Sequence, residues 1–174
     1  EPATIKNNDE ESVWNLTTGR QATVENARKA ADMGVDMIVL TGNPGVGVDN
    51  EAIMQALSKL KDAVGDRVIL TAGKMHASGI ISEAGEKILT EKDIVDFIDA
   101  GADVILLPAP GTVPGITMEY AGKLIKKAHE KGALAMTTIG TSQEGADEDT
   151  IRQIALMCKM AGADIHHIGD SGYM

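Results

Sequence analysis

The sequence predicts a parallel α/β fold built from repeated strand–helix units. The continuous apolar run Val104–Leu107 is too short for a helix and is typical of a strand covered on both faces. Its two ends differ: the compact string Ala100-Gly-Ala-Asp103 stands before it, whereas the Pro/Gly/Thr-rich loop 108–115 follows it. Similar strings, Met33-Gly-Val-Asp36 and Ala161-Gly-Ala-Asp164, precede two other apolar runs. This repetition predicts parallel strands joined by right-handed crossovers.

The first half of the chain is expected to hold an irregular lead-in loop and two units. Residues 1–22 lack a clean apolar period. Thr23 is a suitable N-cap for a helix that ends at Gly34, and Asn50–Val64 carries the apolar stripe of a second helix. The strands are predicted at 36–41 and 67–72, with a small hairpin or turn within 80–89.

The second half is expected to hold three further units. Thr90-Glu-Lys-Asp93 resembles a capping box and opens a helix that ends at Ala100, before the strand 104–107. A helix from Thr117 or Met118 to Lys131 precedes a strand at 133–139. Asp147 is the predicted cap of the last helix, which ends before Gly162 and the strand 164–169.

Five such units fit either a doubly wound sheet or part of a (β/α)₈ barrel. The nearest approach to a dinucleotide-binding fingerprint, Gly42-Asn-Pro-Gly-Val-Gly47, has the wrong spacing and contains Pro44. A doubly wound domain normally begins with its first strand, whereas this chain begins with a loop and a helix. We therefore predict one domain over 1–174, the C-terminal part of a TIM barrel whose earlier strands lie upstream of Glu1.

Composition narrows the classes of partner. The net charge of −10 argues against nucleic acid and anionic membranes as partners, and no apolar run reaches the length of a membrane span. Cys158 is the single cysteine, which favours a cytoplasmic protein without disulfides. A partial barrel would expose strand edges, so further chain or a second copy in a homo-oligomer is expected to cover them.

The site is expected at the carboxyl ends of the strands, as in other parallel α/β folds. The loops predicted there hold varied polar residues, whereas the opposite turns are short. Gly140-Thr-Ser142 and Gly169-Asp-Ser171 follow the last two strands, where backbone N–H groups and hydroxyls often bind phosphate in barrels, although Gly and Ser also simply form turns. The candidate ligand-binding residues are Asn43, Thr112, Gly140, Thr141, Ser142, Gly169 and Ser171.

Lys74, His76 and Asp170 are the candidate catalytic residues. Lys74 directly follows a predicted buried strand, where it could bind an anion, act as a base or form a Schiff base. The alternative is a structural ion pair with Asp170 or Glu144. His76 is the only histidine in a glycine-rich rim loop and could act as a general acid or base.

A metal site is a further possibility. His166 and His167 are adjacent on a predicted strand, so they point to opposite faces and at most one is expected to serve a given site. Asp170 has the parity of His166, and with His76 these residues could form a two-histidine, one-carboxylate site for a divalent metal ion. The sequence does not identify any other cofactor.

Several strings together resemble a known family: Gly42-Asn-Pro-Gly45, Gly73-Lys-Met-His76, Leu107-Pro-Ala-Pro-Gly-Thr-Val-Pro-Gly115, Ile139-Gly-Thr-Ser-Gln-Glu-Gly145 and Ile165-His-His-Ile-Gly-Asp170. They are similar to an uncharacterised bacterial TIM-barrel family whose members are often labelled "haloacid dehalogenase-like hydrolase". The resemblance covers essentially the whole chain and implies the fold but no catalytic roles. The label itself fits poorly, because a dehalogenase-type phosphatase needs Asp-x-Asp-x-Thr/Val at the end of a strand. The most similar string here, Asp147-Glu-Asp-Thr-Ile151, ends in Ile and stands at the start of a predicted helix.

These observations predict an enzyme that acts on a small anionic metabolite, phosphorylated or not. A lyase, aldolase or isomerase-like reaction at the carboxyl rim is favoured, with a small molecule as the partner. The alternatives are a metal-assisted hydrolase on the same rim and a barrel that binds a small ligand without catalysis.

Overall fold

The computed structural model describes residues 18–42, 48–75, 80–139 and 147–168. Five parallel strands form one sheet in chain order: β1 (Met37–Gly42), β2 (Ile69–Lys74), β3 (Val104–Pro108), β4 (Leu134–Ile139) and β5 (Ile165–Ile168). Five helices accompany them: α1 (Val24–Asp32), α2 (Asn50–Val64), α3 (Glu91–Asp99), α4 (Met118–Glu130) and α5 (Glu148–Ala161). Short 3₁₀ turns are η1 (Thr18–Arg20), η3 (Ile81–Glu83) and η4 (Gly85–Ile88).

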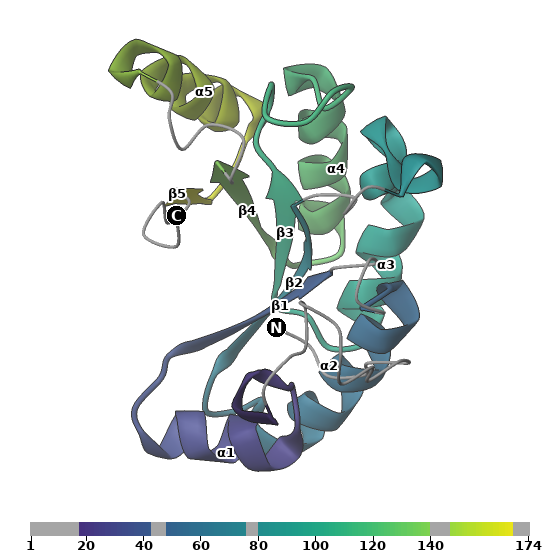
Figure 1. The fold of residues 1–174 in the computed structure, drawn as a ribbon, viewed down its shortest axis with the longest axis vertical. Helices are drawn as coiled ribbons and strands as arrows, with labels where there is room; N and C mark the ends of the chain where they lie inside the picture. Colours follow the sequence, from purple (N-terminus) through teal and green to yellow (C-terminus); the bar gives the residue numbers. More distant parts are fainter. Residues whose placement is uncertain (1–17, 43–47, 76–79, 140–146, 169–174) are drawn as a thin grey trace, which may run out of the picture.

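The arrangement is that of a partial barrel. The sheet curves, and the helices lie along its outer side while its inner side opens away from them (Figure 1). A doubly wound sheet would reverse its strand order at a switch point and carry helices on both faces. The sequential order β1-β2-β3-β4-β5 instead confirms the predicted parallel units of a (β/α)₈ barrel. Within the described ranges, no helix combines the length and apolarity needed to cross a membrane.

The two faces of the sheet are distinct. The outer face packs a large core against the helices, and it includes Leu40, Leu70, Ala72, Ile105, Leu107 and Ala135. A smaller inner cluster contains Val104, Leu106 and Met136, with the partly buried Met37, Val39, Met75 and Ile165 against it. Because strand residues alternate between faces, these two clusters assign every described strand position to one side.

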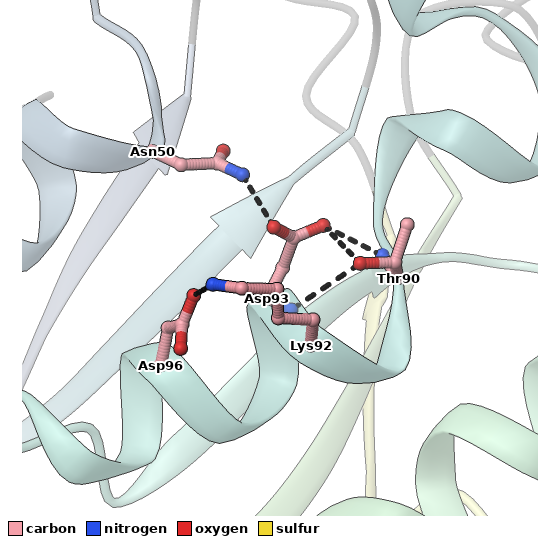
Figure 2. A network of polar contacts seen from close by, with 5 residues as sticks. All are labelled: Asn50, Thr90, Lys92, Asp93 and Asp96. Atoms are coloured by element: carbon pink, nitrogen blue, oxygen red, sulfur yellow. Dashed lines mark hydrogen bonds and ion pairs between the residues drawn. The ribbon is translucent and has the colours of Figure 1, made fainter.

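Side chains fix where the helices begin. Thr23, Asp49, Thr90, Thr117 and Asp147 each accept a hydrogen bond from the backbone amide three residues later. The predicted capping box is confirmed, with Asp93 bonding back to the Thr90 amide. Figure 2 shows that Asn50 Nδ2 also donates to Asp93 Oδ1 at 2.7 Å, and that Lys92 pairs with Asp96. The starts of α2 and α3, at the carboxyl edge of the sheet, are thereby joined.

Three strands end later than predicted: β1 ends at Gly42 instead of residue 41, β2 at Lys74 and β3 at Pro108. β2 was expected at 67–72 but spans Ile69–Lys74, because its pairing with β1 continues to Gly42↔Lys74. β3 includes Pro108, which lacks an amide proton. The missing amide proton is tolerated because the β2–β3 pairing ends at Gly73↔Leu106, two residues before Pro108. The segment expected to be a hairpin or turn forms η3 and η4.

The aspartates of the repeated Gly-Ala-Asp string bind the backbone of the neighbouring strand at the amino edge of the sheet. Asp103 Oδ2 accepts the Leu70 amide at 2.9 Å, and its Oδ1 pairs with Lys61 Nζ at 2.8 Å. Asp164 Oδ2 accepts the Ala135 amide and contacts His129 Nε2, both at 2.8 Å. Burial raises the pKa of Asp164, but the hydrogen bonds from His129 and Ala135 outweigh it and the pKa lies below its ordinary value.

Candidate functional site

The carboxyl rim of the sheet contains three of the predicted site residues within the described part of the chain, namely Lys74, Thr112 and His166. Outside the described residues lie Asn43, His76, Gly140, Thr141, Ser142, Gly169, Asp170 and Ser171. The geometry of the rim is therefore built from the strand ends themselves and from the segments 80–89 and 109–117.

Lys74 is buried on the outer side of the sheet. It shares the parity of Leu70 and Ala72, which belong to the helix-facing core, and its side chain passes over Gly42. Its side chain is only 3% exposed, and Nζ lies 2.8 Å from Glu83 Oε2. Its partner among the described residues is Glu83 of η3, whereas Asp170 and Glu144, the partners that the sequence suggested, lie outside the described residues. This contact fixes η3 against the end of β2.

Thr112 has a structural hydrogen bond in the loop after β3. Its Oγ1 donates to the Ala109 carbonyl at 2.7 Å, and the side chain is buried. The loop and α5 border an open, mainly apolar hollow of about 810 Å³, which Thr112 lines together with Pro110, Val113, Pro114, Met157 and Met160. Thr112 therefore helps to shape this hollow.

The two histidines of β5 separate onto opposite faces, as predicted, but the face of each could not be read from the sequence. His166 Nδ1 lies 3.0 Å from Thr137 Oγ1, and Thr137 shares the strand parity of Ala135, which belongs to the helix-facing core. His166 consequently lies on the helix side. Ile165 packs into the inner cluster, so His167, two residues later, belongs to the inner face.

His167 is part of a polar contact chain that the sequence interpretation missed. Its Nδ1 lies 3.1 Å from Thr138 Oγ1, and Thr138 is its register partner on β4. The Thr138 hydroxyl also lies 3.2 Å from Met75 Sδ at the end of β2. No period or motif marks these residues, because the inner face becomes recognisable only when its apolar neighbours are identified.

The described residues show neither a metal-binding cluster nor an activated cysteine thiol. Among the described residues, no three His, Cys, Asp or Glu side chains converge as metal ligands. The predicted set with His76 and Asp170 lies partly outside those residues. Burial raises the pKa of the Cys158 thiol, which disfavours the reactive thiolate, as expected for a cysteine on a buried helix face.

The fold and its rim define a TIM-barrel-type domain. The chain belongs to the family described as "Domain of unknown function (DUF7916)", whose model matches residues 1–174. The resemblance to a family labelled "haloacid dehalogenase-like hydrolase" is therefore wrong: the matching family carries no such label, and the similar proteins include one named as a putative epimerase and several aldolases.

A curated relative shares part of the sequence. A protein of Actinobacillus pleuropneumoniae serotype 5b, named putative N-acetylmannosamine-6-phosphate 2-epimerase, is 37% identical over 82 residues. The match covers 47% of this chain and 30% of the relative. Proteins of the same name from serotypes 3 and 7 match to the same extent.

Solved structures share the fold at low sequence identity. An archaeal fructose-1,6-bisphosphate aldolase superposes with a TM-score of 0.61 at 17% identity, over 82% of this chain and 53% of that one. Deoxyribose phosphate aldolase from Aeropyrum pernix, whose structure is described as a unique tetramer, gives 0.61 at 20% identity, over 91% and 62%. The carboxyl transferase domain of Rhizobium etli pyruvate carboxylase gives 0.62 at 14% identity, over 99% and 31%. The chain thus spans only part of each of these barrels.

Proposed function

We propose that this domain is part of a TIM-barrel enzyme that performs a lyase, aldolase or isomerase-like reaction on a small phosphorylated metabolite. The observation that carries the proposal is the stretch 37% identical to a protein named as a sugar-phosphate epimerase, in a chain whose five units form a partial barrel. The aldolase barrels support the same class by fold, although their low identity gives no residue roles.

The proposed site lies on the inner side of the carboxyl rim. Phosphate is assigned to the loops after β4 and β5, with Gly140, Thr141, Ser142, Gly169 and Ser171 as its candidate contacts. His76 and Asp170 remain the candidates for proton transfer and for its positioning. Asn43 and Thr112 belong to neighbouring loops of the same rim.

Lys74 fits a positioning function better than direct contact with substrate. It lies on the helix side, almost fully buried, and its ammonium group is paired with Glu83. A Schiff base would require a free neutral amine that reaches the substrate carbonyl. We therefore assign Lys74 to the support of the rim, and we assign no metal-binding function to His166 because it lies on the helix side.

The assembly and location of the protein are also proposals. In the described part of the chain, β1 pairs only with β2 and β5 pairs only with β4. Further strands of the same barrel are the proposed cover for these edges, and a homo-oligomer is the alternative. The lone Cys158 supports a cytoplasmic location.

The function is tested by incubating the full-length protein in D₂O with hexose 6-phosphates and N-acetylhexosamine 6-phosphates. Proton NMR would report exchange of a carbon-bound proton, epimerisation or cleavage. We expect turnover of at least one sugar phosphate and no turnover of the same sugar without its phosphate. Borohydride added during turnover would reveal a Schiff base as a mass increase. The absence of both binding and turnover for every sugar phosphate in the panel would contradict the proposal.

A further inference from the structure

Among the described residues of the inner rim, His167 is an ionisable side chain whose surroundings suit proton transfer. His167 lies at the carboxyl end of β5 on the inner face, two residues after Ile165, and its side chain is exposed. In this part of the barrel, an inward side chain at a strand end faces the volume in which TIM-barrel enzymes bind substrate. His166, one residue earlier, is turned away from that volume.

Thr138 contacts one of the two ring nitrogens of His167. The Thr138 side chain is buried, and its Oγ1 lies 3.2 Å from Met75 Sδ and 3.1 Å from His167 Nδ1. We assign the tautomer in which the hydroxyl donates to the sulfur and accepts from Nδ1–H. In this tautomer Nδ1 carries the proton and Nε2 carries the lone pair. Among the described residues no partner occupies Nε2.

The same contact serves both protonation states of the imidazole. When Nε2 takes up a proton, Nδ1–H continues to donate to the Thr138 oxygen, so the imidazolium needs no rearrangement. Thr138 is 1% exposed, and Met75 is held within the inner cluster, which limits the motion of this support. This is the arrangement of an oriented general base.

We infer that His167 is a catalytic acid/base of the inner rim, beside the candidates His76 and Asp170, with Thr138 and Met75 as its positioning residues. The inference rests on the proposed function. Nε2 removes a proton from the carbon beside the carbonyl of a phosphorylated sugar: the C–H bond breaks, an N–H bond forms, and the electron pair moves to the carbonyl oxygen as an enolate. Exchange of the Nε2 proton with D₂O before its return to the same face of the carbon regenerates the imidazole and gives the deuterated sugar. Epimerisation requires a second acid that delivers a proton to the opposite face while His167 keeps the abstracted one, and His76 is the candidate for it.

The test compares His167→Gln with His166→Gln in the D₂O exchange assay, on full-length protein and with the sugar phosphate that the wild type turns over. We expect H167Q to lower the exchange rate on the order of 100-fold to 10,000-fold, and H166Q to keep the wild-type rate. Thr138→Val should lower kcat with little change in KM, and Thr138→Ser should restore it. Circular dichroism would confirm that each variant is folded.

The outcomes separate the two ideas. A wild type that exchanges no proton of any sugar phosphate overturns the proposed function and this inference with it. An active wild type with an undiminished H167Q overturns the inference alone. If H167Q does not fold, long-range ¹H–¹⁵N spectra of the wild type decide: the sugar phosphate should shift the Nε2 resonance of His167 and not that of His166, and the reverse pattern overturns the inference.

Discussion

At the amino edge of the sheet, carboxylates accept hydrogen bonds from backbone amides. Asp103 and Asp164 each accept the amide of a residue on the neighbouring strand, and each is also paired with a basic side chain of a helix. At the carboxyl edge, the described polar groups instead bridge between elements: Lys74 reaches Glu83 of η3, and His167 reaches Thr138 of β4.

This difference between the two edges distinguishes polar groups that stabilise the fold from polar groups that remain available to a ligand. The amino-edge carboxylates have their oxygens engaged by backbone and by cations, so little capacity remains for a ligand. At the carboxyl edge, His167 Nε2 has no partner among the described residues. Substitutions at the two edges should therefore differ in their effects on stability and on turnover.

Gly73→Ala should be the most damaging change at the carboxyl edge. A Cβ at Gly73 would lie 1.8 Å from the Leu106 carbonyl oxygen, so β2 and β3 would have to separate. We expect a loss of about 3 kcal/mol or more in the free energy of unfolding, measured by urea denaturation. Gly19→Ala is the control, because a Cβ there has no neighbour within 4 Å. Equal stabilities of the two variants would show that the close approach of β2 and β3 is unimportant.

Glu83→Gln should destabilise the protein by about 2 kcal/mol, because it leaves the buried Lys74 ammonium without its counter-charge. This value is below that of a fully buried pair because the Glu83 side chain is 32% exposed. Lys74→Met removes the charge and keeps the bulk, so its stability should stay within about 1 kcal/mol of wild type.

The double variant Glu83→Gln/Lys74→Met distinguishes an ion pair from two independent effects. If the pair matters, the double variant should be more stable than E83Q alone. Strictly additive losses in urea denaturation would argue against coupling. A large loss of turnover in a stably folded K74M would return Lys74 to the catalytic residues.

Asp103→Ala tests the amino edge and should cost about 1–2 kcal/mol of stability, because the Leu70 amide loses its acceptor and Lys61 loses its partner. Asp103→Asn keeps an acceptor for the amide and should cost about 0.5 kcal/mol. Neither substitution should change the rate of sugar-phosphate turnover. A change in that rate without a change in thermal stability would contradict the separation of the two edges.

Asp164→Asn should have the smallest effect, a small loss of stability that is present above about pH 4 and disappears in acid. The pKa of Asp164 is lower in the folded protein than its ordinary 3.8, so the folded state binds the proton less tightly than the unfolded chain. Its stabilisation is therefore complete above about pH 4 and is lost as the pH falls through the lower, folded-state pKa. Thermal unfolding from pH 6 to pH 2.5 should show a shallower acid decline in D164N. An unchanged decline would mean that other carboxylates dominate.

The sequence by itself determined the order and type of the elements. Five apolar runs, three of them preceded by a Gly-Ala-Asp or Gly-Val-Asp string, predicted five parallel strands, and the caps at Thr23, Thr90 and Asp147 predicted helix starts that the structure confirms. These signals are local: a cap bonds within one turn, and a buried strand is recognisable from its own composition.

Only the tertiary structure decided which face each strand residue occupies. Alternation along a strand is fixed at two residues, but a strand buried on both sides is apolar throughout, so the phase of the alternation leaves no trace in the sequence. For this reason Lys74 could be expected at the rim yet lies on the helix side beside Glu83. The same ambiguity hid His167, whose inner position depends on Ile165 packing against Val104, Leu106 and Met136 from distant parts of the chain.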